Sequence, residues 1–317
     1  MRHFTSVSDV ADIDELVEKA LVYRANPLAD MALGNGKRMG LLFMNPSMRT
    51  RISTHVAARN LGIEVIVFNM DKDGWKLELE DDVVMNGTSV EHIKDAAPVL
   101  GAYFDVLGVR TFPTLISKED DYAEPLLSSL IKYAGIPVVS LESSTLHPLQ
   151  SLADIITISE HHNRLTRPKV VLTWAPHIKP IPQCVANSFS QWMTTWGQAD
   201  FVITHPHGYE LDTAYTGNAT IEYDQQAALQ GADFVYVKNW SSVSEYGKVL
   251  TEDSNWMLTR EHLLATNDAR VMHCLPLRRN LELSGEVLDS DNSIVTMQAA
   301  NRVCATQAVL AEILKSL

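Results

Sequence analysis

The sequence is poor in cysteine and contains no long apolar run. Its three cysteines, Cys184, Cys274 and Cys304, have the spacing of neither a disulfide framework nor a metal site. No apolar stretch approaches the length of a membrane-spanning helix, and the start of the chain lacks the apolar segment of a secretory signal. These absences argue against a disulfide-rich secreted protein and against a membrane protein. We therefore expect a cytoplasmic location and no membrane partner.

Basic charge is also scarce. The chain has 26 Lys and Arg against 39 Asp and Glu, a formal net charge of −13. Proteins that bind nucleic acid present a basic face, so we expect no nucleic-acid partner. An anionic ligand would have to be held by basic residues that the fold brings together locally.

What the chain does have is a regular alternation of strands and helices. Its 317 residues suit two domains, and the hydrophobic content of 46% is ordinary for a globular protein. The alternation predicts an α/β fold with parallel sheets. The predicted strands are 38–44, 64–69, 105–110, 136–141, 169–174, 200–204, 232–238 and 270–273. The predicted helices are 47–61, 89–103, 122–133, 148–161 and 298–317. A proline-rich loop is predicted at 176–182, directly after the strand 169–174.

The first predicted strand leads into a candidate phosphate site. Asn45-Pro46 marks a turn, and Ser47 occupies the N-cap position of the next helix. A helix N-terminus offers unpaired N–H groups and a partial positive charge. Arg49 and Arg51 add guanidinium groups whose forked donors suit phosphate oxygens. A capped surface helix with solvated arginines is the alternative on this segment alone.

Other polar residues also stand at the ends of predicted strands. They are Arg110, His147, His177, Lys238 and Cys274. Ligands of open α/β sheets sit beyond the carboxyl ends of the strands, so we expect these side chains to converge. A binding or scaffold module would not need basic residues at successive strand ends. A dinucleotide-dependent oxidoreductase is disfavoured because Gly34-Asn35-Gly36 precedes the first strand instead of following it.

Three motifs in order resemble the aspartate/ornithine carbamoyltransferase family across essentially the whole chain. They are Ser47-Met48-Arg49-Thr50-Arg51, His147-Pro148-Leu149-Gln150 and His273-Cys274-Leu275-Pro276. The resemblance implies two doubly wound parallel-sheet domains. Residues 1–147, completed by the C-terminal helix 299–317, would bind carbamoyl phosphate, and residues 148–298 would bind the amino-acid substrate. The sequence shows no cluster of metal-ligating residues, so we expect neither a metal nor an organic cofactor.

The family resemblance assigns roles on the carbamoyl phosphate side. The turn that begins at Ser47 would cradle the phosphate, and Arg302 would close over it. Arg110, His147 and Thr50 would polarise the carbonyl, while Gln150 would take the carbamoyl NH₂. Trp75 lies in a loop that reaches a neighbouring subunit in the family, which implies a homotrimer with shared sites. The implied carbamoyl phosphate residues are Ser47, Met48, Arg49, Thr50, Trp75, Arg110, His147, Gln150 and Arg302.

The amino-acid side departs from ordinary ornithine carbamoyltransferases. Those enzymes place an aspartate against the free α-ammonium of ornithine, at the strand end where this chain has Lys238. A lysine would repel that ammonium, so the α-amino group of the substrate should be acylated and uncharged. The departure resembles the acylornithine branch, in which the proline-rich loop is associated with a backbone knot. The implied acylornithine residues are Val90, Glu142, His177, Lys179, Lys238, Cys274, Leu275 and Arg278.

One position bears on the acyl group. Val90 stands where the enzymes that use N-acetylornithine resemble one another in having a glutamate. A glutamate would repel the distal carboxylate of a succinyl group, whereas valine would not. We therefore favour N-succinylornithine as the second substrate, with N-acetylornithine as the alternative.

The general base for the attacking amine is not evident from the sequence. Cys274 is near the expected place and is a candidate catalytic residue with Arg110 and His147. A thiol of ordinary pKa is a poor base near neutral pH, so the departing phosphate is the alternative proton acceptor.

Overall fold

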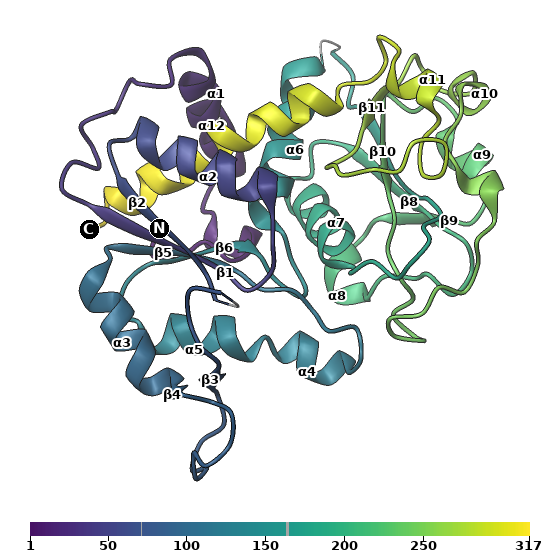
Figure 1. Cartoon of the computed structure of the whole chain (residues 1–317). Helices are drawn as coiled ribbons and strands as arrows, with labels where there is room; N and C mark the ends of the chain where they lie inside the picture. Colours follow the sequence, from purple (N-terminus) through teal and green to yellow (C-terminus); the bar gives the residue numbers. More distant parts are fainter. Residues whose placement is uncertain (71, 163–164) are drawn as a thin grey trace. The chain divides into compact units, whose positions relative to one another are not determined.

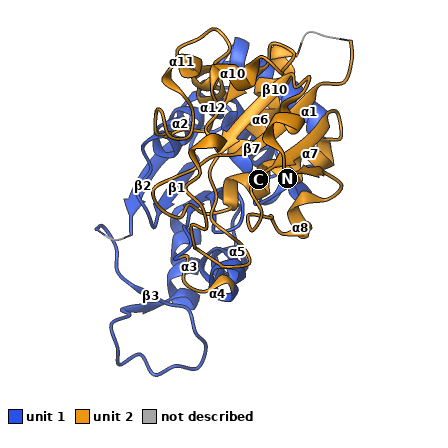
Figure 2. Ribbon diagram, turned by 90° about the vertical axis from the view of Figure 1, so that its right-hand side faces the viewer, with its two compact units in different colours: residues 1–114, 119–149, 302–317 blue, residues 115–118, 150–301 orange. Residues whose placement is uncertain are grey.

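The computed structural model of the chain describes residues 1–70, 72–162 and 165–317. The chain divides into two compact units, shown in different colours in Figure 2. Unit 1 comprises residues 1–114, 119–149 and 302–317, and unit 2 comprises residues 115–118 and 150–301. Two of the four passages between the units lie within the long helices α6 (Pro148–His161) and α12 (Val295–Leu314), and the other two flank residues 115–118.

Unit 1 is built on a four-stranded parallel sheet in the order β2-β1-β5-β6. Most residues of its two central strands are buried, as expected for parallel strands that are covered on both faces. In Figure 1, α3 and α5 cover one face, and α1 and α2 lie on the other. The strands are β1 (Arg38–Phe43), β2 (Glu64–Asn69), β5 (Val106–Arg110) and β6 (Val138–Glu142). The helices are α1 (Ile13–Ala25), α2 (Met48–Asn60), α3 (Ile93–Tyr103), α4 (Lys118–Ala123) and α5 (Pro125–Tyr133).

Unit 1 also contains a small two-stranded ladder and an apolar core. The short strands β3 (Leu77–Glu78) and β4 (Glu91–His92) pair in parallel beside α3. The core between the sheet and helices α3 and α5 includes Leu42, Leu107 and Leu130, all of which are buried. This core fixes the sheet, and with it the segments that follow the carboxyl ends of β1, β5 and β6.

Unit 2 has a five-stranded parallel sheet in the order β11-β10-β7-β8-β9. Its core packs aliphatic residues of β7, β10 and β11 against short helices and loops, with Val171, Val235 and Val271 at the centre. The strands are β7 (Lys169–Trp174), β8 (Asp200–Thr204), β9 (Thr220–Glu222), β10 (Phe234–Lys238) and β11 (Arg270–Met272). Besides α6 and the start of α12, the helices are α7 (Cys184–Trp196), α8 (Thr213–Thr216), α9 (Gln225–Leu229), α10 (Arg260–Leu263) and α11 (Gly285–Leu288).

The predicted fold class, two doubly wound parallel sheets, is confirmed. The helix predicted for 122–133 is wrong in its continuity. It breaks at Glu124, which has a φ of 46°, and α5 starts at Pro125. Proline has no N–H and clashes with the preceding turn, so it begins a new helix instead of extending α4.

Three other predicted helices have different bounds. The helix predicted for 47–61 is α2 and is one residue shorter at each end. The helix predicted for 89–103 begins only at Ile93, because residues 91–92 pair with β3 as β4. The last helix begins at Val295, three residues before the predicted start. Within the described ranges no helix is both long and apolar enough to span a lipid bilayer.

Candidate active site

The N-terminus of α2 in unit 1 presents the predicted phosphate-binding groups. Ser47 occupies the N-cap position in an extended conformation, with a φ of −151°, but its side chain makes no capping hydrogen bond. Arg49 is half-buried and has no hydrogen bond or ion pair with another described residue. A free N-terminal turn beside an unpaired guanidinium is a ready site for an anion.

The two arginines of this motif differ in their surroundings. The Arg51 guanidinium donates a hydrogen bond to Asn69 Oδ1 and lies over the Phe43 ring, 5.3 Å from its centroid. Arg51 is therefore committed to packing α2 against the ends of β1 and β2. Arg49 is the arginine that remains available to a ligand.

Arg302 on α12 adds a second cation to the same region of unit 1. Its Nη2 donates to Thr50 Oγ1 at 2.9 Å, and both side chains are buried. Thr50 lies in the first turn of α2, so a guanidinium from the other end of the sequence stands beside the predicted phosphate site.

A buried cluster of charged and polar groups follows the ends of β5 and β6. Arg110 contacts Glu142 Oε2 through Nε at 2.9 Å and through Nη2 at 2.8 Å. Its Nη1 donates to the carbonyl oxygens of Asn45 at 2.9 Å and Pro46 at 3.1 Å. Arg110 therefore holds the turn that leads into α2. His147 Nε2 lies 3.8 Å from Glu142 Oε2.

The electrostatics of this cluster determine its protonation. Burial lowers the pKa of His147 to about 3, with Arg302 and Arg110 acting in the same direction and Glu142 opposing them. Burial raises the pKa of Glu142, but the neighbouring His147 and the Arg110 guanidinium outweigh burial and leave that pKa below its usual value. At neutral pH the cluster thus contains a neutral imidazole between a carboxylate and arginines. A neutral imidazole can still donate one N–H to a carbonyl oxygen.

Six of the eight predicted acylornithine residues lie in unit 2, at or after the carboxyl ends of β7, β10 and β11: His177, Lys179, Lys238, Cys274, Leu275 and Arg278. Lys238 is buried, and its ammonium donates to the Asn239 carbonyl at 2.9 Å. His177 is buried near Lys238, Arg278 and Glu282, whose charges act on its pKa. Burial is the main cause that lowers the pKa of His177, and its bond to the Lys179 backbone opposes the shift.

Glu282 is a residue that the sequence analysis did not single out. It is buried, and its Oε2 accepts a hydrogen bond from the Arg278 N–H at 2.6 Å. Its Oε1 lies 3.6 Å from His273 Nε2. Burial raises the pKa of Glu282, whereas the nearby His273 and Lys238 lower it and prevail. The only hint in the sequence was its place just beyond the motif that begins at His273.

The segment after β11 has an unusual backbone. Leu275 has a φ of 53°, and the peptide bond between Leu275 and Pro276 is cis. The Leu275 N–H donates to His273 Nδ1 at 2.9 Å, which assigns the imidazole proton to Nε2. Cys274 is half-exposed beside the buried hydroxyl of Tyr236. Lys179 and Arg278 are exposed at this edge of unit 2.

The remaining predicted residues lie elsewhere. Trp75 and Val90 belong to a loop region that projects from unit 1 around β3 and β4 (Figure 1), and their side chains are 52% and 66% exposed. Trp75 Nε1 donates to Glu91 Oε2 at 2.9 Å, and the Val90 N–H donates to the Lys76 carbonyl at 2.9 Å. Neither side chain is enclosed by residues that the structure describes.

Glu142 and Gln150 are both buried. Glu142, predicted on the acylornithine side, contacts Arg110 and lies near His147 in unit 1. Gln150, predicted on the carbamoyl phosphate side, belongs to unit 2 and is buried on α6.

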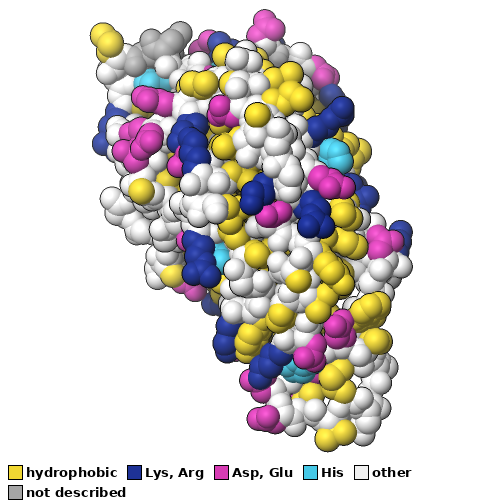
Figure 3. Space-filling model, turned by 90° about the vertical axis from the view of Figure 1, so that its left-hand side faces the viewer, with side chains coloured by type: hydrophobic (Ala, Val, Ile, Leu, Met, Phe, Trp, Pro, Cys, Tyr) yellow, Lys and Arg dark blue, Asp and Glu magenta, His cyan; other side chains and the backbone are white. Residues whose placement is uncertain are grey.

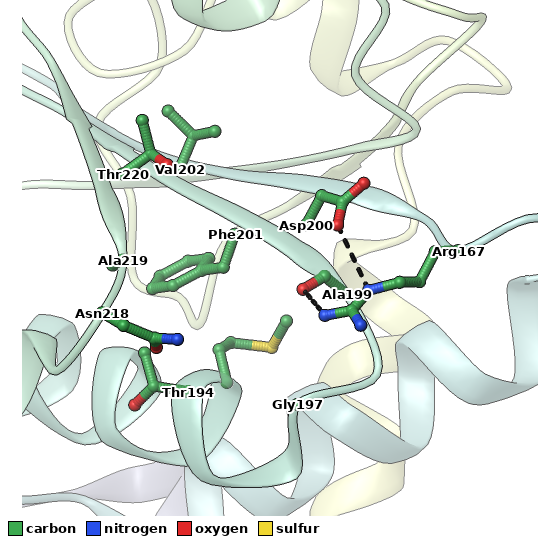
Figure 4. Close-up of a pocket in the computed structure, with 11 residues that line it drawn as sticks. Arg167, Thr194, Gly197, Ala199, Asp200, Phe201, Val202, Asn218, Ala219 and Thr220 are labelled. Carbon is green, nitrogen blue, oxygen red and sulfur yellow. Dashed lines mark hydrogen bonds and ion pairs between the residues drawn. The ribbon is translucent and has the colours of Figure 1, made fainter.

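A cavity of about 320 Å³ in unit 2 contains none of these residues (Figure 4). It opens at the amino ends of β8 and β9, the opposite end from the predicted site. Its Arg167 is already paired with Asp200 at 3.2 Å and with the Ala199 carbonyl at 2.8 Å. The lining residues are Arg167, Met193, Thr194, Gly197, Ala199, Asp200, Phe201, Val202, Asn218, Ala219 and Thr220.

The two parallel sheets, with an uncapped helix N-terminus after β1 of unit 1, define an α/β protein of two units that can bind an anionic ligand at its strand ends. Residues 2–160 match the family model described as aspartate/ornithine carbamoyltransferase, carbamoyl-P binding domain. Residues 183–313 match the corresponding Asp/Orn binding domain. The chain belongs to the aspartate/ornithine carbamoyltransferase family, as its three motifs predicted.

Similar proteins point to the acylornithine branch of this family. The chain is 45% identical to N-succinylornithine carbamoyltransferase of Bacteroides fragilis, over 100% of both chains. It is 34% identical to N-acetylornithine carbamoyltransferase of Xanthomonas campestris, over 98% of this chain and 97% of the relative. A crystal structure of acetylornithine transcarbamylase complexed with acetylcitrulline superimposes with a TM-score of 0.91, at 33% identity over 99% of each chain. The predicted branch is confirmed.

Proposed function

We propose that the protein transfers the carbamoyl group of carbamoyl phosphate to the side-chain amine of N-succinyl-L-ornithine. The products are N-succinyl-L-citrulline and phosphate, in arginine biosynthesis. The observation that carries the proposal is the buried Lys238, a cation at a strand end of unit 2. It favours a substrate whose α-nitrogen is acylated and whose carboxylate is free. The 45% identity to N-succinylornithine carbamoyltransferase supports the same substrate.

Unit 1 supplies the groups for carbamoyl phosphate in this proposal. The N–H groups at Ser47, Met48, Arg49 and Thr50 bind the phosphate, together with the Arg49 and Arg302 guanidinium groups. Arg110 and the neutral His147 donate hydrogen bonds to the carbonyl oxygen. These donors stabilise the oxyanion that forms when the amine attacks the carbonyl carbon. The bond from that carbon to the phosphate oxygen then breaks, and the departing phosphate takes the amine proton.

Unit 2 supplies the groups for the acylornithine. Lys238 binds the α-carboxylate, and Cys274 and Leu275 line the amino-acid side chain. The candidates to bind the distal carboxylate of a succinyl group are the basic side chains of His177, Lys179 and Arg278. In domain terms, residues 1–147 with 299–317 form the carbamoyl phosphate domain, and residues 148–298 form the acylornithine domain.

The preference for succinyl over acetyl rests on Val90. The solved transcarbamylase structures that are similar to this chain include variants in which a glutamate is replaced by alanine, serine or valine. Those variants are complexed with carbamyl phosphate and N-succinyl-L-norvaline. We propose that Val90 stands in the place of that glutamate and leaves room for the distal carboxylate. N-acetylornithine is the second candidate, supported by the relatives at 34% identity.

We also propose a cytoplasmic homotrimer in which Trp75 enters the site of a neighbouring subunit. Three exposed apolar residues at helical spacing on α2, Met48, Ile52 and Val56, support a subunit contact. Apolar side chains also gather in a band on the face drawn in Figure 3. The exposure of Trp75 and Val90 fits a site that is completed by another copy of the chain.

One assay tests the proposed function. The purified protein is incubated with carbonyl-labelled carbamoyl phosphate and, separately, with N-succinyl-L-ornithine, N-acetyl-L-ornithine and L-ornithine. We expect labelled N-succinyl-L-citrulline as the main product. Transfer of the label to unmodified ornithine would contradict the acylated substrate, and no transfer to any amine would contradict carbamoyl transfer.

A further inference from the structure

The glutamate between α4 and α5 of unit 1 has an unusual backbone. Glu124 has a φ of 46° and a ψ of 51°, in the left-handed region. Glycine adopts this conformation at little cost, whereas a residue with a Cβ adopts it under strain. Pro125 follows directly, so Glu124 cannot continue α4. A glutamate where glycine would be less strained indicates a role for the side chain.

The Glu124 carboxylate holds the loop after β6 at Thr145. Its Oε1 accepts hydrogen bonds from the Thr145 N–H and from Thr145 Oγ1, each at 2.8 Å. Thr145 is buried. The carboxylate makes no capping hydrogen bond to α5, so it is committed to the loop and not to its own helix. Hydrogen bonds to a charged acceptor are stronger than neutral ones, and this pair fixes Thr145 against the start of α5.

Residues 143–146 form a loop that is closed on itself. The Ser143 N–H donates to the Leu146 carbonyl at 2.8 Å, and the Leu146 N–H donates to Ser143 Oγ at 3.2 Å. The two ends of the loop therefore lie side by side, and Thr145 ties the loop to Glu124. Because the loop is closed, a displacement of Thr145 would be passed to both of its ends.

The two ends of this loop carry members of the buried cluster in unit 1. Glu142 precedes the loop, and His147 follows it. His147 Nε2 lies 3.8 Å from Glu142 Oε2, and Arg110 Nη2 lies 2.8 Å from the same oxygen. All three side chains are buried. Loop 143–146 thus sets where the imidazole stands relative to the carboxylate and the guanidinium.

We propose that Glu124 is a positioning residue, which holds loop 143–146 and so places the His147 imidazole to donate to the carbonyl oxygen of carbamoyl phosphate. This inference rests on the proposed function, because it takes carbamoyl phosphate as the ligand. Glu124 acts through Thr145, since a carboxylate has no proton to donate to a carbonyl oxygen. The bond from His147 strengthens as negative charge develops on that oxygen, so a displaced imidazole lowers kcat more than it weakens binding.

Glu124→Gly tests this role, because it removes the carboxylate and relieves the strained backbone in one change. We expect kcat for carbamoyl transfer to fall roughly 10- to 100-fold. KM for carbamoyl phosphate, and the dissociation constant of inorganic phosphate measured by calorimetry, should stay within about twofold of wild type. The midpoint of thermal unfolding should change little, since the lost hydrogen bonds and the relieved strain act in opposite directions.

Two further variants separate the hydrogen bonds from the backbone. Glu124→Gln keeps an acceptor oxygen at the same reach and should be clearly faster than Glu124→Gly. Thr145→Val removes only the hydroxyl donor, so its kcat should lie between those of wild type and Glu124→Gly. In the Glu124→Gly background, Thr145→Val should have little further effect, because the acceptor is already gone.

Asp268→Gly is the matched control. Asp268 is also an acidic residue in the left-handed region, with a φ of 53°, and its Oδ1 accepts a hydrogen bond from Asn292 Nδ2 at 2.9 Å. It belongs to unit 2 and precedes the amino end of β11. The same kind of substitution there should leave kcat unchanged.

A wild-type kcat in folded Glu124→Gly would overturn the role of Glu124. Parallel losses of kcat, phosphate affinity and thermal stability would also overturn it, because they would make Glu124 a residue of the fold alone. If Glu124→Gly does not fold, Thr145→Val decides the question, and a wild-type kcat in that variant would contradict the proposal. Failure of the wild type to carbamoylate any amine is a distinct result, which would remove the proposed function and this inference with it.

Discussion

At the scale of residues, Arg49 and Arg51 show how one motif separates into two roles. Arg51 is bonded to Asn69 and lies over Phe43, whereas Arg49 has no partner among the described residues. A cation without a protein partner gains most from an anionic ligand and contributes least to the fold. Substitution of Arg49 is therefore the sharpest test of the phosphate site.

Replacing Arg49 by alanine should cost about 2–4 kcal/mol of transition-state stabilisation. This loss should appear as a lower kcat/KM for carbamoyl phosphate, with both kcat and KM affected. Thermal stability should hardly change. Arg59→Ala, an exposed arginine in the last turn of the same helix, is the control and should leave the kinetics intact. Ordinary kinetics in folded Arg49→Ala would remove this arginine from the phosphate site.

Lys238 is expected to act on one substrate only. Lys238→Met should raise KM for the acylornithine at least tenfold and leave KM for carbamoyl phosphate nearly unchanged, because the lost charge meets only the carboxylate. Lys169→Met, at the other end of the neighbouring strand β7, is the matched control. Equal changes in both KM values for Lys238→Met would argue against a carboxylate contact.

His147 gives a pH dependence with a definite sign. Its pKa is about 3 in the fold against 6.5 for an ordinary histidine, so the unfolded chain binds the proton first as pH falls. The stabilisation from a neutral His147 is complete above about pH 6.5 and is lost as pH falls towards 3, at up to about 1.4 kcal/mol per pH unit. Urea unfolding between pH 5 and 8 should show a shallower dependence for His147→Gln than for wild type. An NMR titration of His147 with an ordinary midpoint would contradict this.

At the scale of elements, strands and long helices were predictable where the apolar pattern is clear. The bounds of β2, β7, β8 and α6 equal the predicted ones. Elements that depend on tertiary pairing were missed, such as β9, whose three residues are held only by the edge of β8. The helix α7 was not predicted either, although its length is ordinary.

The contact between Arg110 and Glu142 could not be read from the sequence. It arises because β5 and β6 pair in a register that sets Arg110 opposite Glu142, with an irregularity just before Arg110. Sheet register depends on packing of the whole sheet. Glu282 was missed because nothing in the sequence marks it, and it becomes notable only through its burial and its position 3.6 Å from His273 Nε2.

If the loop that carries Trp75 completes the site of a neighbouring subunit, two inactive variants should complement each other. Trp75→Ala and Arg49→Ala should each be nearly inactive as pure oligomers. Mixed oligomers of the two should regain part of the activity, because some sites would combine an intact Trp75 with an intact Arg49. Refolded mixtures with no more activity than the separate variants would place Trp75 in its own subunit's site or in packing alone.

At the scale of the whole molecule, a chain with a net charge of −13 is proposed to bind two anionic substrates. The structure is consistent with this through local gatherings of basic residues, Arg49 and Arg302 near α2 in unit 1 and Lys238 and Arg278 in unit 2. The fold and the family followed from the sequence because three motifs and two runs of alternating strands and helices agree. The acyl group depends on one exposed valine, and that makes it the central claim to test.

The most direct measurement compares kcat/KM for N-succinyl-L-ornithine and N-acetyl-L-ornithine in wild type and in Val90→Glu. We predict that the wild type prefers the succinyl substrate and that Val90→Glu shifts the preference towards the acetyl one. A glutamate near the distal carboxylate adds a like-charge contact worth several kcal/mol in a partly desolvated site, enough to invert the order. Val90→Gln, which adds similar bulk without charge, should shift the preference less. A wild type that prefers N-acetyl-L-ornithine would contradict the account and make the acetyl substrate the physiological candidate.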